Sequence, residues 1–297
     1  MAPQNPAHLF LENFRPGRAI SLKNLIEAYA QQILMESNTY RFPVDLQKVF
    51  ERYQLKVYSV PELGRRGMLT EDLKIIVNSS DKEQVQIYSQ AHELIEILVA
   101  ALWDFDPDYL TEEQIKDLND RKEYWCETGA ADILMPMNLF RSFIQDSEFS
   151  IQTAKSVSKS SGLSLFAVLR RMIESDLRKC VFVIWHYAHK PSDFTPNQLT
   201  LGENFAPPKE LRVERAYKCT SLTPVIWNHK SIQIDTAIGK TFLDGGTAIV
   251  RGYDYVEICS IKGYFRTESI HVKYDGISRV WSIVFYDDEV DSQYVIN

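Results

Sequence analysis

The chain has 297 residues, of which 45% are apolar and 25% charged, so it is long enough for two domains with their own cores. A formal net charge of −7 argues against non-specific coating of nucleic acid, and no apolar run reaches the roughly 20 residues of a membrane span. Four cysteines without paired spacing, and a start without the basic-then-apolar order of a secretory signal, predict a reduced, cytoplasmic protein.

The first half of the chain has the pattern of a mainly helical region with a small sheet. Apolar spacing predicts a helix over 22–36, and Asp45 is placed to cap the next helix, "LQKVFERY". The alternating segments "LKVYSV" and "LKIIVN" predict two strands, with Gly64 and Gly67 forming a turn between them. Further helices are expected over about 84–103, 112–134, 150–160 and 164–178.

Beyond about residue 180 the chain becomes rich in β-branched and aromatic residues in alternating runs such as "CVFVIWHY" and "SRVWSIVFY". We therefore predict an α+β fold with a β-rich C-terminal domain, whose many aromatic residues fill a core or line a ligand pocket. The expected divisions are 1–145 for the first domain, 146–180 for a helical element and 181–297 for the β-rich domain, with a linker at about 188–208.

The helical element has the pattern of a helix-turn-helix. Gly162 supplies a tight turn and Ser164 an N-cap, and residues 151–179 hold six Lys or Arg against two acidic residues. One interpretation is a DNA contact through Arg170 and Arg171. The other, which we favour in an acidic chain, is a packing element with a solvated basic face.

The segment "QAHELIEILVAALW" carries the pattern most suggestive of chemistry. His92 and Glu96 are four residues apart, so on a helix both point to one side and can bind one cation. Glu93 is turned by about 100° from His92, which lets it reach a water held by that cation. This spacing is typical of metallohydrolases, except that Glu96 stands where the second histidine is usual.

The surroundings of this segment strengthen the metal interpretation. No Lys or Arg occurs from Glu83 to Ile115, and the helix is apolar almost all round, so its carboxylates must protonate, find a cation elsewhere or bind metal. A third ligand is available because Glu123 and Glu127 lie one helical turn apart in a segment that can return past the first helix. The alternative is that these residues form the solvated stripe of a half-buried helix.

Taken together, "AHEL", "KEYWCETGAADILMP" and the upstream "FPVDLQKVFERYQLKVYSV" resemble the ImmA/IrrE family of bacterial metallo-endopeptidases over about residues 20–180. The resemblance implies a zincin-like domain with His92 and Glu123 as zinc ligands, Glu93 as general base and Glu127 as a residue that orients a ligand. It also implies a cytoplasmic enzyme that cleaves a helix-turn-helix repressor and so controls stress, phage or mobile-element genes. Some members carry a C-terminal sensor-like domain.

Glu96 departs from the family pattern. A carboxylate in place of an imidazole makes the ion less able to acidify water and shifts preference from zinc towards manganese or iron. We expect a metal-dependent endopeptidase, with a catalytically weak module that binds a repressor or DNA as the alternative. A carboxylate-rich redox-metal site built from Glu93, Glu96, Glu123 and Glu127 is a third, less favoured interpretation. The sequence leaves the substrate and the oligomeric state open.

Overall fold

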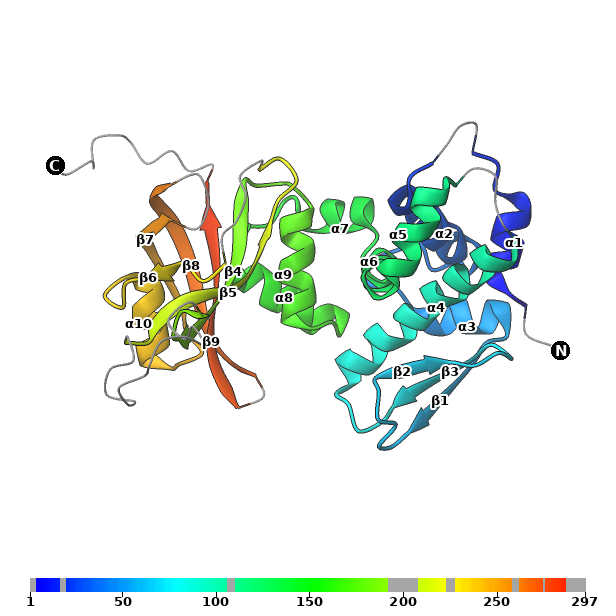
Figure 1. The fold of residues 1–297 in the computed structure, drawn as a ribbon, viewed down its shortest axis with the longest axis horizontal. Helices are drawn as coiled ribbons and strands as arrows, with labels where there is room; N and C mark the ends of the chain where they lie inside the picture. Colours follow the sequence, from blue (N-terminus) through cyan, green and yellow to red (C-terminus); the bar gives the residue numbers. More distant parts are fainter. Residues whose placement is uncertain are drawn as a thin grey trace, which may run out of the picture. The chain divides into compact units, whose positions relative to one another are not determined.

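The structure, a computed structural model, describes residues 4–16, 20–105, 110–191, 208–222, 228–257, 262–274 and 276–286. The chain divides into two compact units, Met1–Asp146 with Val157–Ala167, and Ser147–Ser156 with Val168–Asn297. Each unit combines helices with one sheet, as expected for an α+β protein (Figure 1). Most of the linker expected at 188–208 lies outside the described residues.

The first unit is built mainly of helices. Their bounds are α1 Pro6–Asn13, α2 Leu22–Glu36, α3 Leu46–Tyr53, α4 Glu83–Phe105, α5 Glu112–Asp120, α6 Lys122–Leu134 and α7 Met137–Ile144. Side chains cap several starts, since Ser21 accepts from the backbone of Asn24, and Asp45, as expected, accepts from Gln47. No described helix is long and apolar enough to cross a membrane.

A three-stranded sheet lies beside α4 in the first unit (Figure 1). Its strands are β1 Lys56–Val60, β2 Gly67–Leu69 and β3 Lys74–Asn78, in the order β1-β3-β2. β1 runs parallel to β3, whereas β2 runs antiparallel to it. The prediction of a simple turn around Gly67 was wrong, because that glycine begins the short strand β2 and pairs with Val77.

The helix expected over 112–134 is two helices. α5 ends at Asp120, and α6 begins at Lys122 after Arg121 leaves the helical region with φ −128° and ψ 30°. Asp117 holds the break in place, since its carboxylate accepts from the indole of Trp125 and pairs with Arg121. The break changes the direction of the chain and so decides which side chains of α6 face α4.

The second unit is built around an antiparallel sheet of six strands in the order β6-β5-β4-β9-β8-β7. The strands are β4 Cys180–Ala188, β5 Glu210–Lys218, β6 Ser231–Ile232, β7 Ile249–Glu257, β8 Lys262–Tyr274 and β9 Ile277–Phe285. Three helices accompany them, namely α8 Ile151–Ser161, α9 Leu165–Glu174 and α10 Ala237–Asp244. α8 and α9 are divided between the two units.

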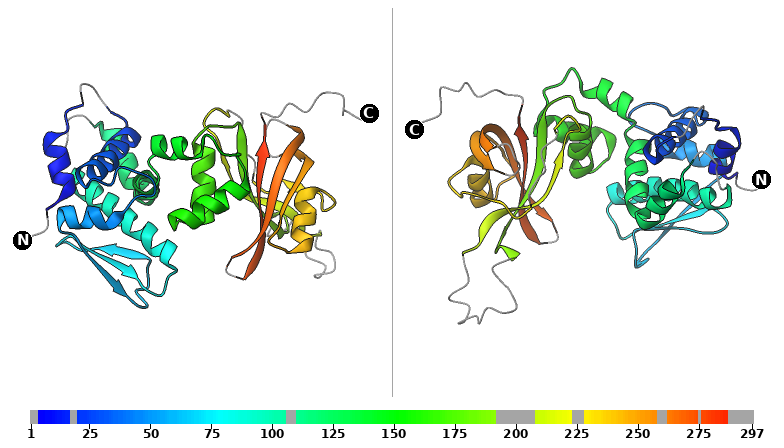
Figure 2. Two further views of the ribbon diagram at one scale, coloured as in Figure 1. Left: turned by 180° about the vertical axis from the view of Figure 1, so that it is seen from behind. Right: turned by 45° about the horizontal axis from the view of Figure 1, so that its top comes forward.

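Helices contact both faces of this larger sheet. Gly252 of β7 faces α10, because a Cβ added there would lie 2.5 Å from the Cβ of Ala237. On the other face, buried Glu268 of β8 accepts a hydrogen bond from the backbone N–H of Ile151 at the start of α8. Figure 2 shows α10 on one side of the sheet and α9 on the other. Helices therefore cover both faces of the sheet, which forms the core of the second unit.

Candidate metal centre

α4 brings three chemically active side chains together. One ligand atom from each of His92, Glu93 and Glu96 lies within 4.8 Å of the others. Glu93 is the most deeply placed, with only 3% of its surface exposed, whereas His92 and Glu96 are partly exposed. The surrounding residues Leu94, Ile95 and Leu98 are fully buried, as predicted for a helix that is apolar almost all round. Glu93 therefore does not belong to a solvated stripe on a half-buried helix, which was the alternative interpretation.

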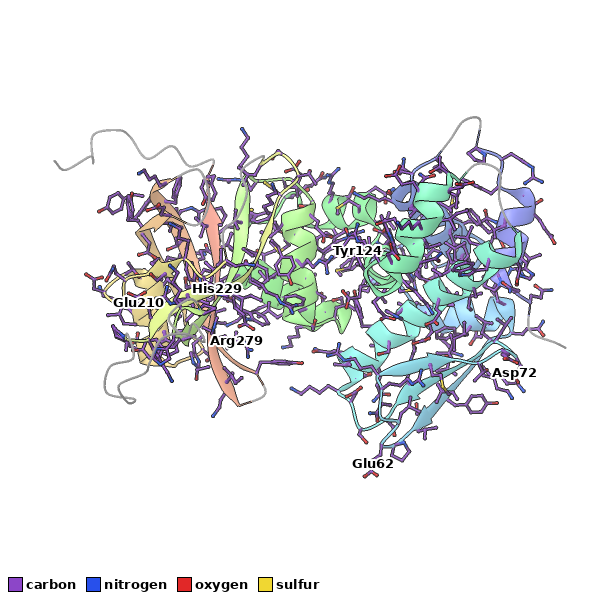
Figure 3. All side chains as sticks on the ribbon, in the orientation of Figure 1. Glu62, Asp72, Tyr124, Glu210, His229 and Arg279 are labelled. Carbon is purple, nitrogen blue, oxygen red and sulfur yellow. The ribbon has the colours of Figure 1, made fainter. Side chains whose placement is uncertain are left out.

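α6 packs against α4 and brings a fourth candidate, Glu123, close to His92, although Glu123 is not one of the three residues whose ligand atoms group together. Nε2 of His92 lies 3.7 Å from Oε2 of Glu123, although 80% of the Glu123 side chain is exposed. The two helices run antiparallel, because Tyr88 of α4 contacts the carbonyl of Glu127, while Glu96 meets Lys122. Figure 3 labels Tyr124 on α6, the residue that follows Glu123. Glu123 therefore stands at the solvent-facing edge of the cluster.

The close approach of α4 and α6 depends on Gly129. A Cβ at this position would lie 2.7 Å from side-chain atoms of both Ile26 and Ile95. The absence of a side chain at 129 thus lets α2, α4 and α6 meet at one point. That contact holds α6 in the register that places Glu123 beside His92.

Lys122 is a functional candidate that the sequence reasoning missed. Its ammonium donates to Oε1 of Glu96, forming an ion pair between α6 and α4. Burial lowers the pKa of Lys122, but its hydrogen bond and charge interaction with Glu96 outweigh that effect and raise it. The sequence "RKEYW" shows that Lys122 precedes Glu123. The direction in which the Lys122 side chain points, however, depends on the helix break at Arg121. Lys122 thus supplies Glu96 with a cation from elsewhere in the chain, one of the three outcomes expected for the carboxylates of this helix.

The protonation of Glu93 is also shifted. Burial, followed by the negative charge of Glu96, raises the pKa of Glu93 to about 8. Its Oε2 atom is buried and has no hydrogen-bond partner among the described residues. Its Oε1 atom lies under β2, where a Cβ on Gly67 would approach it to 2.6 Å. Gly67 therefore provides the space in which this carboxyl group sits.

The donor set fits a divalent ion. Two ligand atoms each about 2.1 Å from one ion are at most about 4.2 Å apart, which the 3.7 Å between His92 and Glu123 already satisfies. The 4.8 Å limit that joins His92 and Glu96 requires only a small approach of partly exposed side chains. A group of one imidazole and several carboxylates, with an orphaned buried oxygen on Glu93, is chemistry that suits a divalent ion.

Two further residues of α6, Glu127 and Cys126, differ in their exposure to solvent. Glu127, expected to orient a ligand, is exposed, and its backbone carbonyl rather than its carboxylate accepts the hydrogen bond from Tyr88, at 2.7 Å. Cys126 is buried, and burial followed by the charge of Glu96 raises the pKa of its thiol to about 12. Cys126 is thus a small core residue and not a reactive thiolate.

The basic residues proposed for DNA contact are already engaged within the second unit. Arg171 is buried and pairs with Glu174. Arg170 donates to Glu174 at 2.8 Å and stacks over the ring of Tyr217. Arg171 is therefore turned into the core, whereas Arg170 is partly exposed and is held by Glu174 and Tyr217.

No family model and no curated protein matches this chain. Among solved structures, the chain is similar to a Mycobacterium tuberculosis transcriptional regulator, with a TM-score of 0.55 and 11% sequence identity. The match covers 94% of this chain and 79% of that one. The similarity therefore concerns the fold across nearly the whole chain, including both units.

Proposed function

We propose that the first unit is a metal-dependent endopeptidase that cleaves a partner regulatory protein. The observation that carries the proposal is the buried Glu93 carboxyl beside the imidazole of His92 and the carboxylate of Glu96, with Glu123 3.7 Å from that imidazole. His92, Glu96 and Glu123 would hold the ion, and Glu93 would act on the reacting water. A bound divalent ion supplies a polarised carbonyl and a more acidic water.

Glu93 has the properties of a general base and acid in this site. Burial and the charge of Glu96 raise the pKa of Glu93 in the metal-free site, and a divalent ion bound beside it would lower that pKa again, towards the ionised form that a general base needs. In its ionised form Glu93 takes a proton from water, and in its protonated form it gives that proton to the leaving amine. Gly67 leaves this carboxyl room above the helix.

β2 supports a peptide as the substrate. It is the last strand in the order β1-β3-β2, so one of its edges is left for pairing in the described part of the sheet. An extended peptide that adds to such an edge gains main-chain hydrogen bonds. Since β2 passes over Glu93 at Gly67, the added peptide would run beside the candidate catalytic group.

The proposed partner is a helix-turn-helix repressor, and the ion is zinc, manganese or iron. The family resemblance of the sequence points to this partner, and the structural neighbour is itself a transcriptional regulator. Carboxylates at Glu96 and Glu123 favour manganese or iron more than a site with two histidines would. The family resemblance and the structural neighbour together are the basis for proposing a role in transcriptional control through proteolysis.

Glu93→Gln tests the proposal because it keeps the shape of the side chain and removes its proton exchange. We expect cleavage of purified helix-turn-helix repressors, assayed with zinc or manganese by gel and mass spectrometry, to fall by about 100-fold or more. Glu127→Gln is the matched control, since it changes an exposed carboxylate on α6, and it should cleave as wild type does. Equal cleavage by the wild type and Glu93→Gln would overturn the assignment.

A second candidate function is a catalytically weak module that binds a repressor. The Lys122–Glu96 ion pair favours it, because a cation from the protein itself already occupies one candidate ligand. In that case Glu93→Gln and the wild type would bind the repressor equally, neither would cleave it, and both would regulate its target promoter alike.

A further inference from the structure

The ion pair between Lys122 and Glu96 sits inside the candidate metal centre. Glu96 offers one of the three ligand atoms that lie within 4.8 Å of one another, and the ammonium of Lys122 donates to a carboxylate oxygen of the same residue. Two cations cannot share this carboxylate at close range without strong repulsion. An ion bound to Glu96 is therefore destabilised while Lys122 stays in place, and it binds more tightly once the ammonium has turned away.

The fold holds Lys122 at this position and also allows it to move. α6 begins at Lys122, directly after the break at Arg121, and its packing on α4 is fixed by the close contact at Gly129. The backbone of Lys122 is thus placed by the helix pair. Its side chain is 41% exposed, so the ammonium can turn into water without disturbing the core.

We propose that Lys122 is an internal competitor of the metal ion for Glu96, and that it sets how tightly the centre binds a divalent ion. This inference rests on the proposed metal site. The ammonium opposes every divalent ion to a similar degree, so at a given free concentration only ions high in the affinity order for oxygen and nitrogen ligands fill the site. Lys122 therefore raises the intrinsic affinity that an ion needs to occupy the centre, a requirement that zinc meets more readily than magnesium or manganese.

The test measures metal affinity and not activity. Zinc and manganese are titrated into the full-length, metal-free protein, with free ion concentrations set by chelator buffers and bound metal measured by mass spectrometry. Lys122→Met removes the competing charge, and we expect it to bind both ions more tightly, by a similar factor of about ten. Lys122→Arg keeps a cation beside Glu96 and should stay near the wild-type affinity.

Two controls identify the site and the charge effect. Lys116→Met removes one exposed positive charge from the neighbouring helix α5 and should leave both affinities unchanged. His92→Ala removes a candidate ligand and should abolish stoichiometric binding in the wild-type and Lys122→Met backgrounds. Circular dichroism of each variant shows that the chain is folded, and Lys122→Gln replaces Lys122→Met if the latter is not.

The outcomes separate this inference from the proposed function. Stoichiometric binding of equal strength by the wild type and Lys122→Met, or equally tight binding by Lys122→Arg and Lys122→Met, would overturn the competition and leave the metal site standing. Weaker binding by Lys122→Met would show that Lys122 supports the site, and would also overturn the inference. No stoichiometric binding by any folded variant would overturn the metal site and the competition together.

Discussion

At the scale of single residues, Gly67 leaves room for the carboxyl group of Glu93, because the strand that carries Gly67 passes directly over it. A methyl group at residue 67 would stand 2.6 Å from Oε1 of Glu93 and 3.3 Å from the Cβ of Ser89. The first of these distances is too short for any stable contact. The position of the candidate catalytic carboxyl is therefore determined by a glycine that lies 26 residues earlier in the chain.

Replacement of Gly67 by alanine should disturb both stability and the candidate site. We expect Gly67→Ala to lower the free energy of unfolding by about 1–3 kcal/mol, because the added methyl group overpacks the contact between β2 and α4. Urea unfolding measures the loss. Gly246→Ala is a suitable control, since a Cβ there meets nothing within 4 Å, and an equal effect of both substitutions would contradict the packing argument.

At the scale of single elements, α10 depends on a residue from another part of the chain. Asp254 of β7 is buried, and its carboxylate accepts hydrogen bonds from the backbone N–H groups of Ala237 and Ile238 and from the hydroxyl of Thr267. The two N–H groups belong to the first turn of α10, where a helix has no internal acceptors. Asp254 thus attaches the start of α10 to the sheet.

Removal of that carboxylate should destabilise the second unit. We expect Asp254→Ala to lower the free energy of unfolding by about 2–3 kcal/mol, since it leaves buried donors without an acceptor. Asp244→Ala, at the exposed end of the same helix, should change it by less than about 0.5 kcal/mol. Thermal unfolding followed by circular dichroism compares them, and indistinguishable midpoints for the two variants would argue against this role.

The elements differ in how far the sequence predicts them. The helix over 22–36 was predicted with the bounds that the structure gives, because its apolar spacing is a local signal. β5 was not predicted, because charges interrupt its apolar alternation, and these charges are accommodated by ion pairs such as Arg212 with Glu210 and Arg279 with Glu214. α10 was missed for a related reason, since part of its capping comes from Asp254, which is remote in sequence.

The residues of the candidate site were likewise predicted only in part. Spacing along one helix was enough to bring His92, Glu93 and Glu96 together, and the gap to Glu123 allowed an antiparallel return. Lys122 was not foreseen, since a break without proline or glycine sets the rotation of α6. Glu127 was expected to orient a ligand because the family resemblance implied that role, but its side chain is exposed.

For the whole molecule, the division into two compact units predicts where metal binding is felt. Ligand binding stabilises the structure that contains the site by mass action, about 2.7 kcal/mol when the free ion exceeds its dissociation constant 100-fold. We therefore expect zinc to slow hydrogen exchange in α4 and α6 by up to about 100-fold, with little change in β4, β8 and β9.

Hydrogen exchange followed by mass spectrometry measures this difference on the full chain. Addition of a chelator should reverse the protection of α4 and α6, and His92→Ala should show no protection on addition of zinc. Equal slowing in the strands of the second unit would contradict the expectation, because it would mean that both units open in one step.

Gly129 lies six residues, about 9 Å along α6, from the nearest candidate ligand, Glu123. If the helix slid by one turn against its neighbour, the carboxylate of Glu127 would come opposite His92, and the thiol of Cys126 would come opposite Glu96. The partner set would then hold sulfur in place of an ammonium, and softer ions would be preferred. The contact at Gly129 thus keeps a carboxylate opposite His92 and an ammonium, not a thiol, opposite Glu96.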